Sequence, residues 1–179
     1  MKKSILQIVC VLLFAMTTMA IRCDDVFPGE NEYVMSEDNV PQEYYHTTIS
    51  ASYFQQCIVG YGWKLDESWK INADGVASLY IINGESEFIP KDLYFDKDSI
   101  TLFLFKQNIN ERQSDAYTYD VSKNLIVSKV VDYMQLAYAD STNIELIERI
   151  GNTYYANYYE RMLPYELNAL WNGSKPEEK

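Results

Sequence analysis

The chain has 179 residues, of which 15 are Lys or Arg and 26 are Asp or Glu, and its formal net charge is −11. This length suits one domain with a sizeable apolar core and leaves no room for a second. The acidic excess argues against nucleic acid and anionic membrane surfaces as partners, because both attract basic patches.

The N-terminus has the layout of an export signal over residues 1–22, in which Lys2 and Lys3 precede a mostly apolar segment, 4–20. Two processing events fit this layout. One is cleavage after Ala20. The other, which we favour, is lipid modification of Cys23, because Cys23 follows the apolar segment and acidic residues come directly after it. We therefore expect a lipoprotein of the outer membrane or cell surface, or otherwise a periplasmic or secreted protein.

Residues 23–48 are acidic and lack hydrophobic periodicity, so they predict a tether between the anchor and the domain. The only histidine, His46, lies near the end of this tether. The other cysteines are Cys10 in the signal and Cys57 in the domain, so the chain has no disulfide framework.

The stretch 60–75 predicts the first strand of the domain and a tight turn. Apolar and polar side chains alternate from Trp63 to Ile71, which is the period-two pattern of a half-buried strand. Glu67 is the one charge on the apolar face. Asp74 and Gly75 tolerate positive φ, so a hairpin should lead into the apolar run 76–82.

Two short helices are expected at the ends of the domain. Ser50 is a capping residue before an apolar pair that repeats four residues on, which predicts a helix over 50–58. Leucines at helical spacing follow Pro164, a residue suited to a first helical turn, and predict a second short helix before a charged tail, 173–179.

Further strand segments fill the rest of a domain spanning 49–172, and Asn108 to Ser114 is expected to be a polar turn. These segments are 93–95, 100–105, 117–121, 125–131, 133–138, 144–150 and 153–161. Their connections are short, so neighbours should be antiparallel. The fold class is all-β, and an eight-stranded up-and-down barrel is favoured because closure removes exposed edges. A two-sheet sandwich is the alternative.

Several of these features together resemble the lipocalin-like, calycin-type lipoproteins of gut-type Gram-negative bacteria. They are the short first helix, a Gly-rich approach to Trp63, the Asp-Gly hairpin, the Tyr-rich last strand ending at Arg161, and the lipoprotein-like start. The resemblance implies the barrel, and it implies that Arg161 lies over Trp63 to close one end. A guanidinium over an indole contributes about 0.5 to 2 kcal/mol, a structural role.

Candidate ligand-binding residues lie on the first and last strands. They are Trp63, Glu67, Trp69, Tyr155 and Tyr159. The tyrosines fit a ligand cavity, or they reflect only the preference of strands for aromatic residues. Glu67 has two readings. A bulge at 66–68 turns it out to water, or it anchors the polar end of an amphipathic ligand whose apolar part lies against the two tryptophans.

Catalysis has little support in the sequence. The sole imidazole lies in the predicted tether, and no spacing indicates a metal site, a phosphate loop or a cofactor. We therefore expect no enzyme, no metal and no cofactor. Two function classes remain: a barrel that binds a small apolar or amphipathic ligand, and a filled barrel that acts as a structural or protein-interaction module at the cell surface. The oligomeric state stays open.

Overall fold

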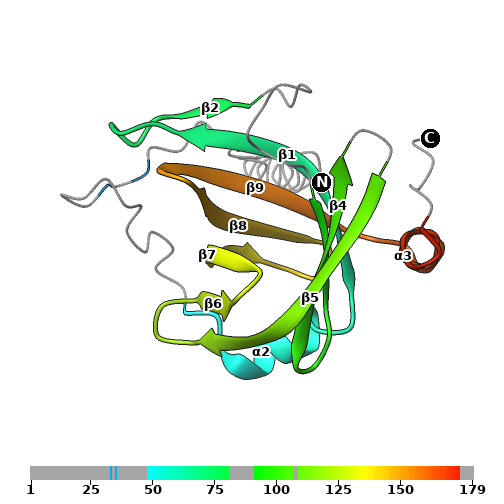
Figure 1. The fold of residues 1–179 in the computed structure, drawn as a ribbon. Helices are drawn as coiled ribbons and strands as arrows, with labels where there is room; N and C mark the ends of the chain where they lie inside the picture. The colour runs from blue at the N-terminus through cyan, green and yellow to red at the C-terminus, as the bar shows by residue number, and fades with distance from the viewer. Residues whose placement is uncertain (1–32, 34, 36–47, 81–90, 107–108, 174–179) are drawn as a thin grey trace, which may run out of the picture.

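The structure, a computed structural model, describes residues 33, 35, 48–80, 91–106 and 109–173. Nine strands and two short helices make up this part of the chain (Figure 1). In chain order they are α2 (Ala51–Cys57), β1 (Gly62–Ile71), β2 (Ala77–Leu79), β3 (Lys91–Phe95), β4 (Ser99–Lys106), β5 (Ile109–Asp120), β6 (Leu125–Ser128), β7 (Val131–Ala139), β8 (Asn143–Ile150), β9 (Thr153–Arg161) and α3 (Pro164–Trp171).

Eight of the strands, β1 and β3 to β9, form a closed antiparallel barrel, which confirms the predicted fold class. Each strand pairs with the next along the chain, and β9 pairs with β1 to complete the ring. The arrangement is consistent with a lipocalin-like fold. The alternative, a two-sheet sandwich, is therefore not the architecture.

The predicted hairpin at Asp74 and Gly75 is confirmed, because β2 pairs antiparallel with β1 across this turn, but β2 is a ninth strand that lies outside the barrel. It is short and pairs only with the far end of β1, where Trp69 faces Leu79. The near end of β1 pairs instead with β3, where Trp63 faces Leu93. Two strands thus pair with the same edge of β1, β3 at its start and β2 at its end. The ring of the barrel continues through β3.

The predicted polar turn over 108–114 is wrong, because β5 begins at Ile109 and runs through this segment. Its residues alternate between two environments: Arg112 and Ser114 are exposed, whereas Glu111 and Gln113 are half-buried. Polar residues can occupy both faces here because this end of β5 lies at the barrel rim. A period-two pattern built from polar residues was therefore mistaken for a turn.

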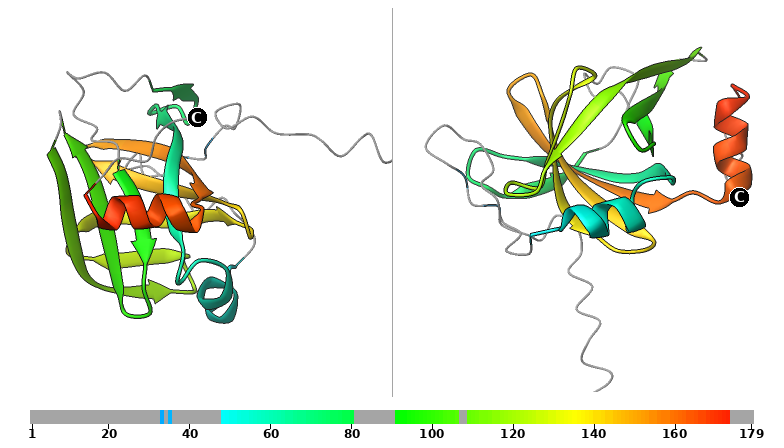
Figure 2. Two further views of the ribbon diagram at one scale, coloured as in Figure 1. Left: turned by 90° about the vertical axis from the view of Figure 1, so that its right-hand side faces the viewer. Right: turned by 90° about the horizontal axis from the view of Figure 1, so that it is seen from below.

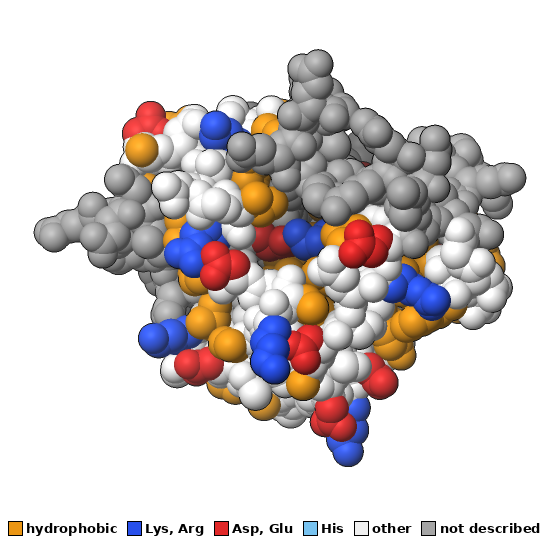
Figure 3. All heavy atoms as spheres, in the orientation of Figure 1, with side chains coloured by type: hydrophobic (Ala, Val, Ile, Leu, Met, Phe, Trp, Pro, Cys, Tyr) orange, Lys and Arg blue, Asp and Glu red, His pale blue; other side chains and the backbone are white. Residues whose placement is uncertain are grey.

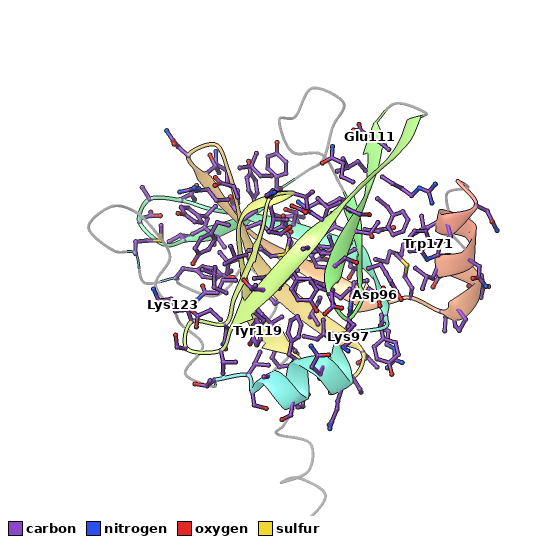
Figure 4. The ribbon with its side chains drawn as sticks, turned by 60° about the horizontal axis from the view of Figure 1, so that its bottom comes forward. Asp96, Lys97, Glu111, Tyr119, Lys123 and Trp171 are labelled. Carbon is purple, nitrogen blue, oxygen red and sulfur yellow. The ribbon has the colours of Figure 1, made fainter. Side chains whose placement is uncertain are left out.

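Helix α2 closes one end of the barrel, as the view from below shows (Figure 2, right). The Ser50 hydroxyl caps the helix by accepting a hydrogen bond from the Tyr53 amide at 3.2 Å, which confirms the predicted helix start. Phe54 enters the barrel end, where its ring stacks on Tyr119 at 4.2 Å and meets the Phe95 ring edge-on at 5.8 Å. Figure 4 shows Tyr119 beside this helix.

Helix α3 confirms the second predicted helix and lies across the outside of the barrel wall (Figure 2, left). Trp171, labelled in Figure 4, meets the rings of Tyr94 and Phe103 edge-on at 5.6 and 5.1 Å. The Arg112 guanidinium lies 5.6 Å from the Trp171 ring. Helix and wall are thus held by an aromatic contact outside the main core.

Part of the predicted tether packs on the barrel. Tyr33 is only 3% exposed and joins an outer apolar cluster with Ile71 and Tyr154. Its hydroxyl donates to Glu145 Oε1 at 3.0 Å, and its amide donates to the Gly75 carbonyl at 2.7 Å. Tyr33 therefore belongs to the folded domain, although the surrounding sequence has no hydrophobic periodicity.

The predicted export signal, 1–22, and the lipidation residue Cys23 lie outside the described residues, as does His46. Within the part of the chain that the structure describes, no helix has the length and apolar character needed to cross a membrane.

Candidate functional site

The two ends of the barrel differ in how they are filled. Side chains pack the end next to α2, where Trp63, Phe95 and Ile126 are almost fully buried. A cavity of about 260 Å³ lies toward the opposite end. Its lining comes from β3, β4, β5, β7, β8 and the turn before β7, and includes Lys91, Leu102, Leu104, Gln113, Val131 and Glu148.

An ion pair between Lys91 and Glu148 lies in the wall of this cavity. Both residues are buried. The second carboxylate oxygen of Glu148, Oε1, accepts a hydrogen bond from the Tyr159 hydroxyl at 2.7 Å. Both oxygens of the buried carboxylate are therefore engaged, as a buried charge requires. In Figure 3 acidic and basic side chains lie together in a hollow among apolar ones.

The pKa of Tyr159 shows how strongly this site favours one protonation state. Complete burial raises the pKa of Tyr159 well above its usual value, and the charges of Glu148 and Asp92 and the hydrogen bond to Glu148 raise it further. The hydroxyl is therefore a permanent proton donor at ordinary pH, and it fixes the orientation of the Glu148 carboxylate.

A second ion pair stands at the cavity rim. Arg149 donates from Nε and Nη2 to Asp132 Oδ2, at 3.0 and 2.6 Å. Both residues line the cavity; the Asp132 side chain is largely exposed, and the Arg149 side chain is partly exposed. The two cations and two anions of the cavity balance, so the site offers polar groups without a net charge.

The predicted bulge on β1 is present, and it decides where Glu67 and Trp69 point. The register with β9 shifts between Leu65 and Glu67. Before the shift Trp63 faces the core, and after it Ser68 faces inward, whereas Trp69 packs in the outer cluster. The Trp69 indole donates to Glu67 Oε2 at 3.0 Å on that outer side. Glu67 and Trp69 therefore do not line the cavity.

Trp63 and Arg161 are direct partners across β1 and β9, as expected of the residues that close the barrel. Trp63 is fully buried, and its indole nitrogen donates to the Ile58 carbonyl at 3.3 Å. The Arg161 guanidinium, however, lies 3.2 Å from the ring centre of Tyr61 rather than over Trp63. The predicted cation–π contact exists at this end with a different ring.

Tyr155 and Tyr159 both lie on the inward side of β9, with Asn157 between them, but neither tyrosine is among the residues that line the cavity. Tyr155 is buried and meets the Tyr80 ring edge-on at 5.2 Å. Asn157 accepts a hydrogen bond from the Ser68 hydroxyl at 2.6 Å. Its Nδ2 is buried and finds no hydrogen-bond partner among the described residues. Such an orphaned donor inside a barrel is unusual and needs an explanation.

Lys91, Gln113 and Glu148 were not predicted as site residues, although the alternation of side chains along the strands indicates the positions of Lys91 and Glu148. Lys91 precedes Leu93 and Phe95 at period two, and Glu148 follows Ile144 and Leu146 in the same way. Both charges therefore fall on the inward face of their strands. Searching each strand for a charge in phase with the apolar residues would have found this pair.

Comparisons with models of known protein families, with curated proteins and with solved structures find no match.

Proposed function

We propose that the protein binds a small apolar or amphipathic molecule in the open end of its barrel and catalyses no reaction. The observation that carries this proposal is the cavity with an apolar wall at Leu102, Leu104 and Val131 and a buried polar group at Lys91 and Glu148. An apolar wall with a few placed polar groups is the usual composition of a ligand site.

The chemistry of the site favours a ligand that is neutral overall. The charges that line the cavity already form pairs, so a charged head group would have to break one of them. A hydroxyl or carbonyl can instead accept from the side-chain amide of Gln113, which lines the cavity. The volume of about 260 Å³ limits the ligand to a small molecule.

Native mass spectrometry of the protein isolated from its producing cells tests this proposal. We expect a retained small-molecule mass that Val131→Trp removes, because Val131 lines the cavity. Val127→Trp is the matched control, since Val127 lies 51% exposed on β6. Retained mass in both variants would place the ligand elsewhere. No retained mass, together with no binding of 1-hexanol by the full chain in calorimetry, would contradict the proposal.

The second candidate is a filled barrel that serves as a structural or protein-interaction module. The observation that favours it is the dense packing of the α2 end, where Trp63, Leu93 and Phe95 have no exposed surface. This candidate predicts that neither native mass spectrometry nor 1-hexanol reveals a ligand, so the same experiment separates the two.

We also propose that Cys23 carries a lipid and holds the protein at the outer membrane or cell surface. The support is the sequence alone, in which Cys23 follows an apolar segment and precedes acidic residues. Feeding cells radiolabelled fatty acid should label the wild type and Cys57→Ala but not Cys23→Ala. Equal labelling of the two variants, or a mature N-terminus at Ile21, would contradict the lipid anchor.

A further inference from the structure

The amine of Lys91 gives the barrel cavity a chemistry beyond hydrogen bonding. Among the described residues that line the cavity, Lys91 is the only lysine. Its side chain is 9% exposed, and its Nζ forms the ion pair with Glu148 Oε2 in the cavity wall. A lysine amine in an apolar pocket is the group by which proteins hold carbonyl compounds covalently, as Schiff bases.

A purely structural role does not account for this ion pair. Taking two charges out of water costs about as much as their attraction returns, so well-packed apolar residues in their place would stabilise the barrel equally well. Apolar residues fill the neighbouring inward positions of β3, where Leu93 and Phe95 have no exposed surface. The pair therefore calls for a role in the ligand site.

Glu148 is positioned to move a proton to and from the amine. Its Oε2 contacts Lys91 Nζ, and its Oε1 accepts the hydrogen bond from the Tyr159 hydroxyl at 2.7 Å. Tyr159 thus holds the carboxylate in place from the side away from Lys91. A fixed carboxylate in contact with an ammonium group has the geometry of a general base.

An apolar surface begins directly beside Lys91. Leu104 is the partner of Lys91 across β3 and β4, so the two side chains lie on the same face of the sheet. Leu102 precedes Leu104 by two residues and shares that face, and both leucines line the cavity. A molecule whose polar end reaches Nζ therefore places its apolar chain against these leucines.

We propose that Lys91 binds a small aliphatic aldehyde as a protonated imine, with Glu148 as proton carrier and counterion. The inference rests on the proposed binding function and names the chemical class of its ligand. An aldehyde is neutral, so it enters without breaking an ion pair of the cavity. Its imine keeps a positive charge on the Lys91 nitrogen, next to the Glu148 carboxylate.

The reaction balances with these groups alone. The Lys91 ammonium gives one proton to Glu148, and the free amine adds to the aldehyde carbon, which forms the C–N bond. One nitrogen proton passes to the former carbonyl oxygen and yields a carbinolamine. Glu148 returns its proton to this hydroxyl, which leaves as water, and the nitrogen lone pair forms the C=N bond of the protonated imine. Water reverses the same steps and releases the aldehyde.

Reductive labelling of the full chain tests the proposal. Hexanal is added with sodium cyanoborohydride, which reduces an imine to a stable secondary amine, and peptide mapping locates the hexyl groups. We expect Lys91 to be labelled at least about tenfold faster than the exposed Lys70 and Lys123, and its rate to saturate with hexanal, because the cavity holds the aldehyde against the amine. Labelling of Lys91 no faster than that of Lys70 would overturn the proposal.

Competition and a cavity variant show where the aldehyde reacts. An excess of 1-hexanol, which has the same chain without a carbonyl, should slow labelling of Lys91 and not of Lys70. Val131→Trp should do the same by filling the cavity, whereas Val127→Trp, at an exposed position of β6, should not. Labelling of Lys91 that neither hexanol nor Val131→Trp slows would contradict an imine formed in the cavity.

Glu148→Gln tests the proton carrier. Glutamine keeps the shape of the side chain but does not take the ammonium proton, so labelling of Lys91 should slow by at least about tenfold. An unchanged rate would overturn the role of Glu148. Site mapping and competition use the wild type, so they decide the question even if this variant does not fold.

Calorimetry with 1-hexanol separates this inference from the proposed function. Binding of 1-hexanol together with unselective labelling of lysines would overturn the imine and leave ligand binding in the barrel intact. Absence of hexanol binding together with unselective labelling would overturn both.

Discussion

Lys91 of β3 and Glu148 of β8 meet inside the barrel, although neither strand neighbours the other in the sheet. Lys91→Met should lower the free energy of unfolding by about 3 to 5 kcal/mol, because it leaves a buried carboxylate without its cation. Adding Glu148→Leu should recover most of this loss. Urea unfolding measures both changes, with Lys70→Met at an exposed site as the control. Losses that simply add in the double variant would show that the two charges do not interact.

Stability should fall at high pH because tyrosines at the closed end are protected from ionisation. Burial raises the pKa of Tyr117 and of Tyr119 to about 12, with smaller effects from nearby aspartates. The unfolded chain loses these protons near pH 10, so stability is constant below that pH and falls between about pH 10 and 12. Urea unfolding across this range should show a shallower fall for Tyr119→Phe than for the exposed-site variant Tyr165→Phe. Equal slopes would contradict the assignment.

Gly75 should be far less tolerant of substitution than Gly151, although both have positive φ. A Cβ at Gly75, with φ +85°, would lie 1.8 Å from the Tyr33 carbonyl oxygen, whereas a Cβ at Gly151, with φ +60°, meets nothing within 4 Å. Gly151→Ala should cost about 1 to 2 kcal/mol for the strained φ alone. Gly75→Ala should cost more, because Tyr33 must also leave the outer cluster. Similar thermal midpoints for the two variants would show that the Tyr33 contact adds no stability.

Phe54 should behave as a core residue even though it lies on a seven-residue helix outside the sheet. Its side chain is 1% exposed and packs against Phe95, Tyr117 and Tyr119. Phe54→Ala should lower the free energy of unfolding by about 3 to 5 kcal/mol. Gln55→Ala, at the neighbouring exposed position, should leave it nearly unchanged. A small loss for Phe54→Ala would mean that α2 is a loosely attached cap.

Much of the fold follows from local pattern, because hydrophobic alternation and turn residues act over short stretches. The strand from Trp63 to Ile71 and the helix capped by Ser50 were predictable in this way. The first half of β5 was not, since its alternation is between polar residues. The position of β2 outside the barrel was not predictable either, because sequence does not reveal how β2 and β3 divide one edge of β1 between them.

The candidate site was less predictable for a related reason. Glu67 follows Trp63 and Leu65 at a spacing of two residues, so the sequence predicts that all three side chains lie on one face of β1. The bulge between Leu65 and Glu67 moves the Glu67 side chain to the other face. The buried carboxylate of the barrel is Glu148, on a strand remote in the sequence from its partner Lys91. Such a pair forms only when the closed barrel brings distant strands across from each other. A short stretch of sequence does not show which residues will meet in this way.

The pairing of β1 with β9 also governs how the protein can fold. These strands are the first and last of the ring, and they pair from Trp63 and Arg161 to Ile71 and Tyr154. A growing chain therefore keeps open edges on β1 and β8 until its final strand is available. Pairing between segments so far apart in the sequence slows folding, and the intermediate with open strand edges is prone to aggregation. Loss of the segment after Ile150 should therefore yield aggregates instead of a smaller barrel.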